Sequence, residues 1–183
     1  EDGSVRIAAA AEAAAIMDEA VAKKLADLLL SGDDAERQAA QSALMAAPFP
    51  GVGPELAARY STAKDPAQKE MLLQILAHRR DHRQMPTFVA AARDADKTVR
   101  KAAIKGLPRL ATAKDLKVLL ELMYMAPGSE RMGLQTALVA AVQEYGDPDD
   151  RARPFITELH AQAGKYAESL LQIIGRIGGP AAL

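Results

Sequence analysis

Cysteine and tryptophan are absent from the sequence, and only 4% of its residues are aromatic. Without cysteine the chain can form no disulfide, no thiolate metal site and no cysteine nucleophile. With so few aromatic rings it offers little on which nucleic-acid bases could stack. The hydrophobic residues, 49% of the chain, are mostly alanine and leucine, and such side chains suit closely packed helices.

The sequence also lacks an excess of charge of either sign and any long apolar run. Its 23 lysines and arginines against 24 aspartates and glutamates give a formal net charge of −1. No global field therefore attracts a polyanion or an anionic lipid surface. The apolar stretches are interrupted by charges before they reach the roughly 20 residues that a membrane-spanning helix needs. These features disfavour nucleic acid as a partner and predict no membrane insertion.

Apolar residues recur three and four positions apart along almost the whole chain, and sustained two-residue alternation is missing. This pattern predicts an all-α protein. Prolines and glycines punctuate the pattern and predict short helices. Asp65 and Pro66 are expected to cap and begin one helix, Ser129 to cap another, and Pro108 to bend or end a third.

The predicted helices pair into repeats. Equivalent apolar positions, Leu44, Leu76, Leu107, Leu138 and Ile174, are separated by 32, 31, 31 and 36 residues. A helix pair of this length cannot bury its own apolar stripe and must stack on its neighbours. We expect one repeat domain over residues 1–183, with helix pairs at about 18–47, 52–80, 83–111, 114–145 and 150–177 and a preceding or capping helix in 1–17.

The third pair carries the clearest motif, the run from Asp94 to Leu107 (DADKTVRKAAIKGL). It resembles the HEAT-repeat consensus, in which an aspartate stands ahead of a Val-Arg pair and alanines and a leucine follow at helical spacing. The resemblance implies a right-handed α-solenoid with a ladder of turn residues, here Asp94 and Arg100. Arg37 and Arg131 keep the arginine of this ladder, but Ser31 and Met125 stand where its aspartate would be.

The last 14 residues, LLQIIGRIGGPAAL, resemble the junction between two HEAT repeats. We interpret residues 178–183 as the start of a further repeat, and the chain as part of a longer protein. The arrangement from Asp94 onward is similar to repeat arrays of large bacterial multidomain proteins. Some of those are exported and fused to a sugar-active or haem domain.

Candidate chemical groups are few. His78 and His82 have a spacing that could hold a metal on one helix, but they flank Arg79 and Arg80 where a helix is expected to end. The third histidine, His160, has no predicted catalytic partner. The acidic pairs at residues 33–34 and 149–150 each precede or begin a helix, where capping explains them. We therefore predict no catalytic, metal or cofactor site, and no enzymatic activity.

A basic run extends from Arg79 to Arg109 and is the best argument for nucleic-acid binding, as in HEAT-like repair proteins. The second helix of each pair, however, is expected to line the concave face, where the exposed positions are mostly neutral. The predicted interaction surface comprises Gln41, Gln74, Lys101, Lys105, Gln135 and Gln172. We expect a scaffold that binds another protein or a peptide. The alternatives are a nucleic-acid-binding repair-type protein and an accessory arm of an exported carbohydrate-active protein.

Overall fold

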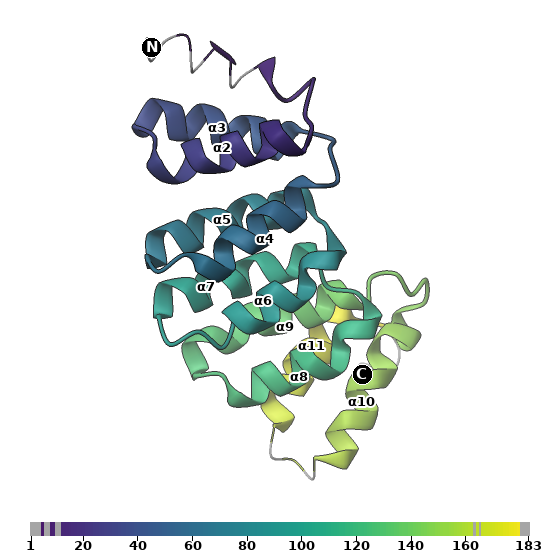
Figure 1. Cartoon of the computed structure of the whole chain (residues 1–183). Helices are drawn as coiled ribbons and strands as arrows, with labels where there is room; N and C mark the ends of the chain where they lie inside the picture. Colours follow the sequence, from purple (N-terminus) through teal and green to yellow (C-terminus); the bar gives the residue numbers. More distant parts are fainter. Residues whose placement is uncertain (1–4, 6–7, 10–11, 163, 165, 180–183) are drawn as a thin grey trace. The chain divides into compact units, whose positions relative to one another are not determined.

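The computed structural model describes residues 5, 8–9, 12–162, 164 and 166–179. These residues form ten α-helices, α2 to α11, and short 3₁₀ turns, and they contain no strand (Figure 1). The all-α prediction is confirmed for these residues. The chain divides into two compact units, an N-terminal unit of Glu1–Thr87 and a C-terminal unit of Phe88–Leu183.

The N-terminal unit consists of two helix pairs and a 3₁₀ turn. Its elements are α2 (Glu19–Ser31), α3 (Asp34–Ala46), α4 (Val52–Thr62), α5 (Pro66–Arg79), η1 (His82–Gln84) and the start of α6 (Met85–Ala91). Helix α2 packs on α3 and α4 on α5, while α2 lies beside α4 and α3 beside α5 (Figure 1). First helices and second helices therefore form two layers.

Leucines fill the space between these layers. Leu29, Leu44, Leu56, Leu72 and Leu76 are completely buried. Each such side chain stabilises the fold by about 1.5–3 kcal/mol relative to an exposed one. Because these residues come from all four helices, each pair depends on its neighbour for burial.

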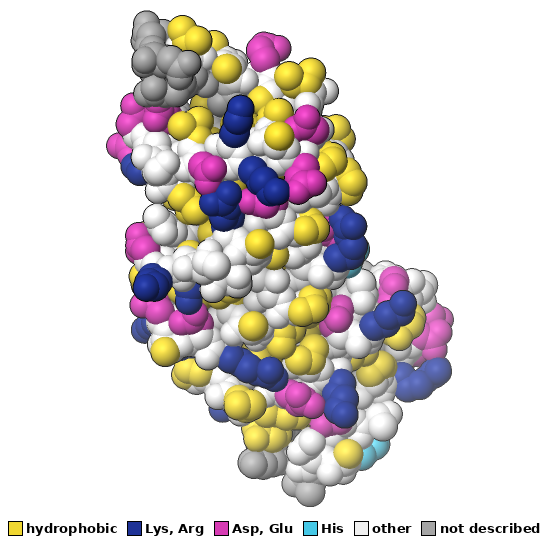
Figure 2. Space-filling view, in the orientation of Figure 1, with side chains coloured by type: hydrophobic (Ala, Val, Ile, Leu, Met, Phe, Trp, Pro, Cys, Tyr) yellow, Lys and Arg dark blue, Asp and Glu magenta, His cyan; other side chains and the backbone are white. Residues whose placement is uncertain are grey.

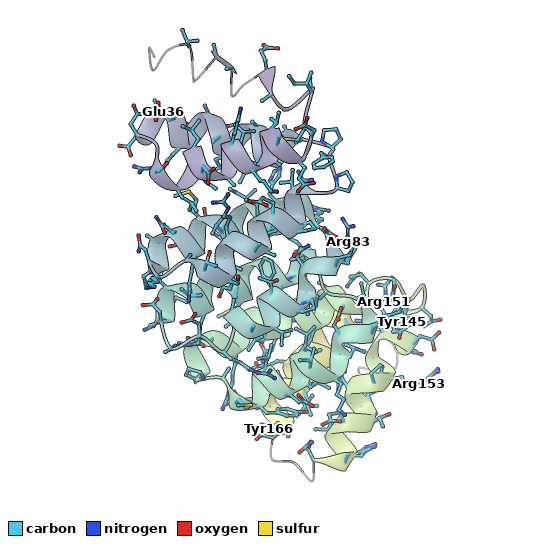
Figure 3. The ribbon with its side chains drawn as sticks, viewed as in Figure 1. Glu36, Arg83, Tyr145, Arg151, Arg153 and Tyr166 are labelled. Carbon is cyan, nitrogen blue, oxygen red and sulfur yellow. The ribbon has the colours of Figure 1, made fainter. Side chains whose placement is uncertain are left out.

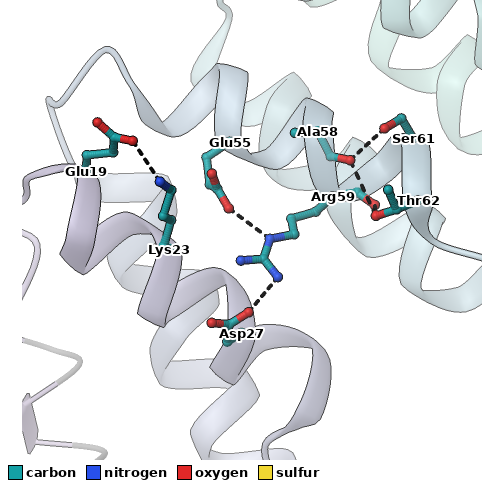
Figure 4. A network of polar contacts seen from close by, with 8 residues as sticks. All are labelled: Glu19, Lys23, Asp27, Glu55, Ala58, Arg59, Ser61 and Thr62. Carbon is teal, nitrogen blue, oxygen red and sulfur yellow. Dashed lines mark hydrogen bonds and ion pairs between the residues drawn. The ribbon is translucent and has the colours of Figure 1, made fainter.

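Polar contacts also connect the two pairs of this unit. The Arg59 guanidinium of α4 donates to Glu55 one turn earlier, at 2.8 Å, and forms an ion pair with Asp27 of α2 (Figure 4). Both Arg59 and Asp27 are partly exposed, so the ion pair contributes little stability. The ion pair is nevertheless a polar contact between the first helices of the two pairs.

Helix starts follow the local sequence closely. The Asp65 carboxylate accepts a hydrogen bond from the Ala67 amide at 3.0 Å, and Pro66 is the first helical residue of α5, as predicted. Asp33 and Glu36 form a reciprocal capping box at the start of α3. The prediction for Ser129 is wrong: α9 begins one residue earlier, with Pro127 as N-cap, so Ser129 lies inside the helix and makes no capping bond.

The C-terminal unit contains the end of α6, the helix that follows it, and two further pairs. Its other elements are α7 (Lys97–Gly106), η2 (Leu107–Arg109), η3 (Ala113–Asp115), α8 (Leu116–Met125), α9 (Gly128–Ala141), α10 (Pro148–Ala161) and α11 (Ala167–Ile177). Helix α8 packs on α9 and α10 on α11, and α9 contacts both α7 and α11. The second helices α7, α9 and α11 thus lie in sequence order as one layer.

Pro108 ends α7 early, as predicted. The helix stops at Gly106, and residues 107–109 continue as the 3₁₀ turn η2. Proline lacks the amide that would extend the α-helical hydrogen bonding, and its ring clashes with the preceding turn. The change in geometry carries Leu107 and Leu110 into the core, where both are completely buried.

At the chain ends, parts of two predictions lie outside the described residues. The helix expected in residues 1–17 includes residues 1–4, 6–7 and 10–11, and the start of a further repeat includes residues 180–183. Gly178 and Gly179, which follow α11, have positive φ angles of 73° and 97°. Such angles favour glycine, so these two residues form the turn that ends α11.

Helices α7 and α9 approach each other closely at Gly133. A Cβ atom there would lie 2.5 Å from Cγ2 of Ile104. We expect Gly133→Ala to lower the free energy of unfolding by about 1 kcal/mol, because overpacking outweighs the gain in helix propensity. Urea denaturation would measure the change. Gly175→Ala on α11, where an added Cβ meets no atom within 4 Å, should raise stability instead. A stability gain in both variants would contradict the close approach.

Candidate interaction surface

In the N-terminal unit the predicted surface residues lie on the second helices. Gln41 is half-buried on α3, and Gln74 is exposed on α5. The Gln74 amide donates to Glu70, one turn earlier, at 3.1 Å. The two glutamines therefore stand on neighbouring helices of one layer.

In the C-terminal unit, Lys101 and Lys105 are exposed on α7, and the other two predicted surface residues, Gln135 and Gln172, contact each other. Gln135 of α9 is only 5% exposed, and its Nε2 donates to Oε1 of Gln172 on α11 at 2.7 Å and to the Ser169 carbonyl at 3.5 Å. These bonds tie α9 to α11.

Beside this glutamine pair lies an open groove of about 670 Å³. Helices α9 and α11 supply its walls: Gly128, Arg131, Met132, Gln135, Thr136, Glu168, Ser169, Gln172, Gly175 and Arg176. Met132 is 71% exposed, so its side chain is available to a partner. Sequence reasoning identified the two glutamines but missed Met132, Gly175 and Arg176. The sequence shows where these residues lie along α9 and α11. The pattern of one helix alone does not show that the groove-lining faces of the two helices lie side by side.

The arginines of the predicted ladder share one position, the fourth residue of a helix, and one role. Each guanidinium donates to a carbonyl of the turn that precedes its helix. The bonds run from Arg37 to Gly32 at 3.0 Å, from Arg100 to Ala95 at 2.9 Å, and from Arg131 to Ala126 at 3.1 Å. This bond satisfies a carbonyl that the turn leaves without an intrahelical donor.

A fourth arginine makes the same bond and was missed. Arg151 is the fourth residue of α10, and its Nε donates to the Tyr145 carbonyl at 2.6 Å (Figure 3). Arg151 lies in the first helix of its pair, whereas the other three arginines lie in second helices. A search for arginine five residues after an interhelical turn, in either helix, would have found it.

Arg100 also connects two repeats. Its guanidinium forms an ion pair with Glu130 of α9 at 3.1 Å, and it donates to the carbonyls of Asp94 and Ala95. The Glu130 side chain is only 3% exposed. Both side chains line a pocket of about 280 Å³, together with Ile104, Leu122, Leu134, Arg93 and Asp94. A carboxylate buried to this extent requires its cation.

Comparison with known proteins finds a family match for the central part of the chain. Residues 53–139 match the sequence model of the family described as HEAT repeats. These residues are HEAT repeats. The match extends from α4 through most of α9, and it contains Arg100, Glu130 and Arg131. No curated protein matches the chain.

Within the HEAT repeats, members of the predicted basic run have structural partners. Arg79 donates to the carbonyls of Leu44, Ala47 and Phe49 at 2.6–2.9 Å and so holds the turn between α3 and α4. Arg83 binds the Asp81 carboxylate at 2.8 Å and thereby lowers the pKa of Asp81. On the face that Figure 2 presents, basic and acidic side chains are interspersed.

The histidines do not converge. His78 is the penultimate residue of α5, His82 begins η1, and His160 is near the end of α10. All three are exposed. Within the part of the chain that the structure describes, no three His, Asp or Glu side chains are grouped to hold a metal ion. Nor is any of the described helices long and apolar enough to cross a bilayer.

A tyrosine pair joins α8, which lies within the HEAT match, to the chain beyond it. The rings of Tyr124 and Tyr166 stack with centroids 3.9 Å apart, and the Tyr124 hydroxyl donates to Glu158 of α10 at 2.9 Å. Gln162 donates to the same carboxylate oxygen at 2.6 Å. Burial, together with the hydrogen bond to Glu158, raises the pKa of Tyr124 well above its usual value.

We expect Tyr124 to remain protonated at a pH where an exposed tyrosine has ionised. The folded state holds this proton more tightly than the unfolded chain, so the stabilisation is intact below pH of about 10 and declines as the pH rises above it. Ultraviolet titration of the native protein and of Tyr124→Phe should give the same tyrosinate absorbance near pH 10. A smaller absorbance change in the variant would show that Tyr124 ionises normally.

Proposed function

We propose that this chain is a non-catalytic scaffold that binds another protein through its layer of second helices. HEAT repeats stack into extended surfaces that commonly serve protein recognition. The groove between α9 and α11 is the observation that carries the proposal, because its volume lies within the range of ligand sites and its wall includes a largely exposed methionine. Methionine adapts its shape to different partners.

The predicted surface residues of the C-terminal unit fit this role. Lys101 and Lys105 on α7 present charged ends to solvent, and Gln172 is exposed on α11. Lys101, Lys105 and Gln172 lie on the same layer of helices as the groove, since α9 contacts both α7 and α11. A partner seated in the groove could reach polar groups on either side of it, which is how polar rims surround the apolar centre of protein interfaces.

Peptide selection followed by nuclear magnetic resonance tests this proposal. Random short peptides displayed on phage would be selected against the full chain, and the enriched peptides titrated into isotope-labelled protein. We expect shifts concentrated on α7, α9 and α11. Enrichment of no peptide, or shifts confined to α8 and α10, would contradict the scaffold proposal.

Nucleic-acid binding is the alternative to the protein-binding role. A DNA-binding protein would bind a fluorescent oligonucleotide at low salt and release it steeply as salt rises. We expect no such binding, because the arginines at residues 79 and 83 already have protein partners and the formal net charge is −1. Salt-sensitive binding by this chain would favour the nucleic-acid alternative over a protein scaffold.

A further inference from the structure

The groove between α9 and α11 has a positive character that its partner must match. Arg131 and Arg176 line it together with a single acidic residue, Glu168. Arg131 uses its Nε to reach the Ala126 carbonyl, and Arg176 uses one Nη to reach the Thr136 hydroxyl at 3.1 Å. Among the described residues neither arginine has an ion-pair partner. Both retain guanidinium donors for a carboxylate.

The same groove has room for an apolar side chain. Met132 projects from α9 and is 71% exposed, and Gly175 on α11 contributes no side chain. A Cβ added at Gly175 would meet no atom within 4 Å, so the space in front of it is open. The buried Gln135 bonds to Gln172 across the two helices and fixes the width of the groove at this point.

We infer that this groove binds a peptide segment of a partner protein in which a large apolar residue is flanked by aspartate or glutamate. The apolar residue packs on Met132 over Gly175, and the carboxylates pair with Arg131 and Arg176. Charge complementarity selects this class of partner over a basic one, because two unpaired cations beside one anion would repel it. The inference rests on the proposed scaffold role and names the chemistry of the partner.

Two substitutions in the groove test the inference on peptides selected against the full chain. Arg176→Glu reverses one of the two cations, and Gly175→Trp fills the open space. Each should weaken binding by about tenfold or more, since buried central contacts dominate interface energetics. The matched controls are Arg153→Glu, which makes the same charge change on the exposed face of α10, and Gly146→Trp, which adds the same ring at an exposed glycine outside the groove. Both controls should bind normally.

The sequences of the enriched peptides provide a second readout. We expect an excess of aspartate and glutamate next to a large apolar residue, and shifts at the Met132 methyl and the Gly175 amide on binding. Raised salt should weaken the complex without abolishing it, because the apolar contact is not screened. Circular dichroism and unfolding midpoints would confirm that all four variants are folded.

The outcomes separate this inference from the scaffold proposal. Peptides that bind α7, α9 or α11 but lack acidic residues, or that bind Arg176→Glu as tightly as Arg153→Glu, would overturn the inference and leave the scaffold role standing. Displacement of the peptide by single-stranded DNA, or occupation of the groove by a second copy of the chain in sedimentation experiments, would also overturn it. The absence of any enriched peptide would count against both.

Discussion

Replacement of Arg100 by methionine should lower the free energy of unfolding by about 3–5 kcal/mol, the usual cost of removing one partner from a buried ion pair. Glu130, with its side chain 3% exposed, would keep its negative charge without the ion-pair partner it has among the described residues. The carbonyls of Asp94 and Ala95 would lose their donor as well. Methionine retains much of the aliphatic volume of arginine, so packing changes contribute little. Urea denaturation would measure the loss.

The double variant Arg100→Met/Glu130→Met identifies the cause of that loss. When both charges are replaced by apolar groups of similar size, much of the stability is expected to return. Arg131→Met is the matched control, because Arg131 occupies the same helix position and bonds a turn carbonyl but has no ion pair among the described residues. It should cost about 1 kcal/mol, the value of one hydrogen bond. A double variant no more stable than Arg100→Met would show that the turn, not the charge pair, is responsible.

Features encoded by adjacent residues were predictable from the sequence. Pro66 and Pro108 restrict their own backbone, so a helix start at one and a helix end at the other follow from covalent geometry. The recurrence of leucine at about 31 residues predicted repeated helix pairs, because each pair must bury the same stripe. Ser129 misled the prediction because Pro127, with its fixed φ, takes the capping position first.

Features that join different repeats could not be derived this way. Arg100 and Glu130 are 30 residues apart, and Gln135 and Gln172 are 37 apart. Each contact depends on how two helices pack, and the pattern of either helix alone does not specify it. The groove has the same origin, because Met132 and Gly175 become its wall only when α9 lies against α11. The sequence thus identified the positions on second helices, and the packing determined which of them meet.

Truncation of Leu107 to alanine should cost about 2–4 kcal/mol, the range for removing a buried leucine side chain. Leu107 is 0% exposed, and its 3₁₀ turn packs against α9. It also holds a helical backbone conformation (φ −49°, ψ −42°) directly before Pro108, where that conformation is disfavoured. Alanine would keep this unfavourable backbone while losing the burial that offsets it. Urea denaturation would measure the loss.

Two further substitutions distinguish a core cavity from a general effect of shortening leucine. Leu107→Met conserves volume and should cost less than about 1.5 kcal/mol. Leu171→Ala on α11, where the side chain is 55% exposed, should change stability by no more than about 0.5 kcal/mol. If Leu107→Ala and Leu171→Ala were equally mild, η2 would not be anchored in the core by Leu107, and the backbone conformation before Pro108 would need another source of stability.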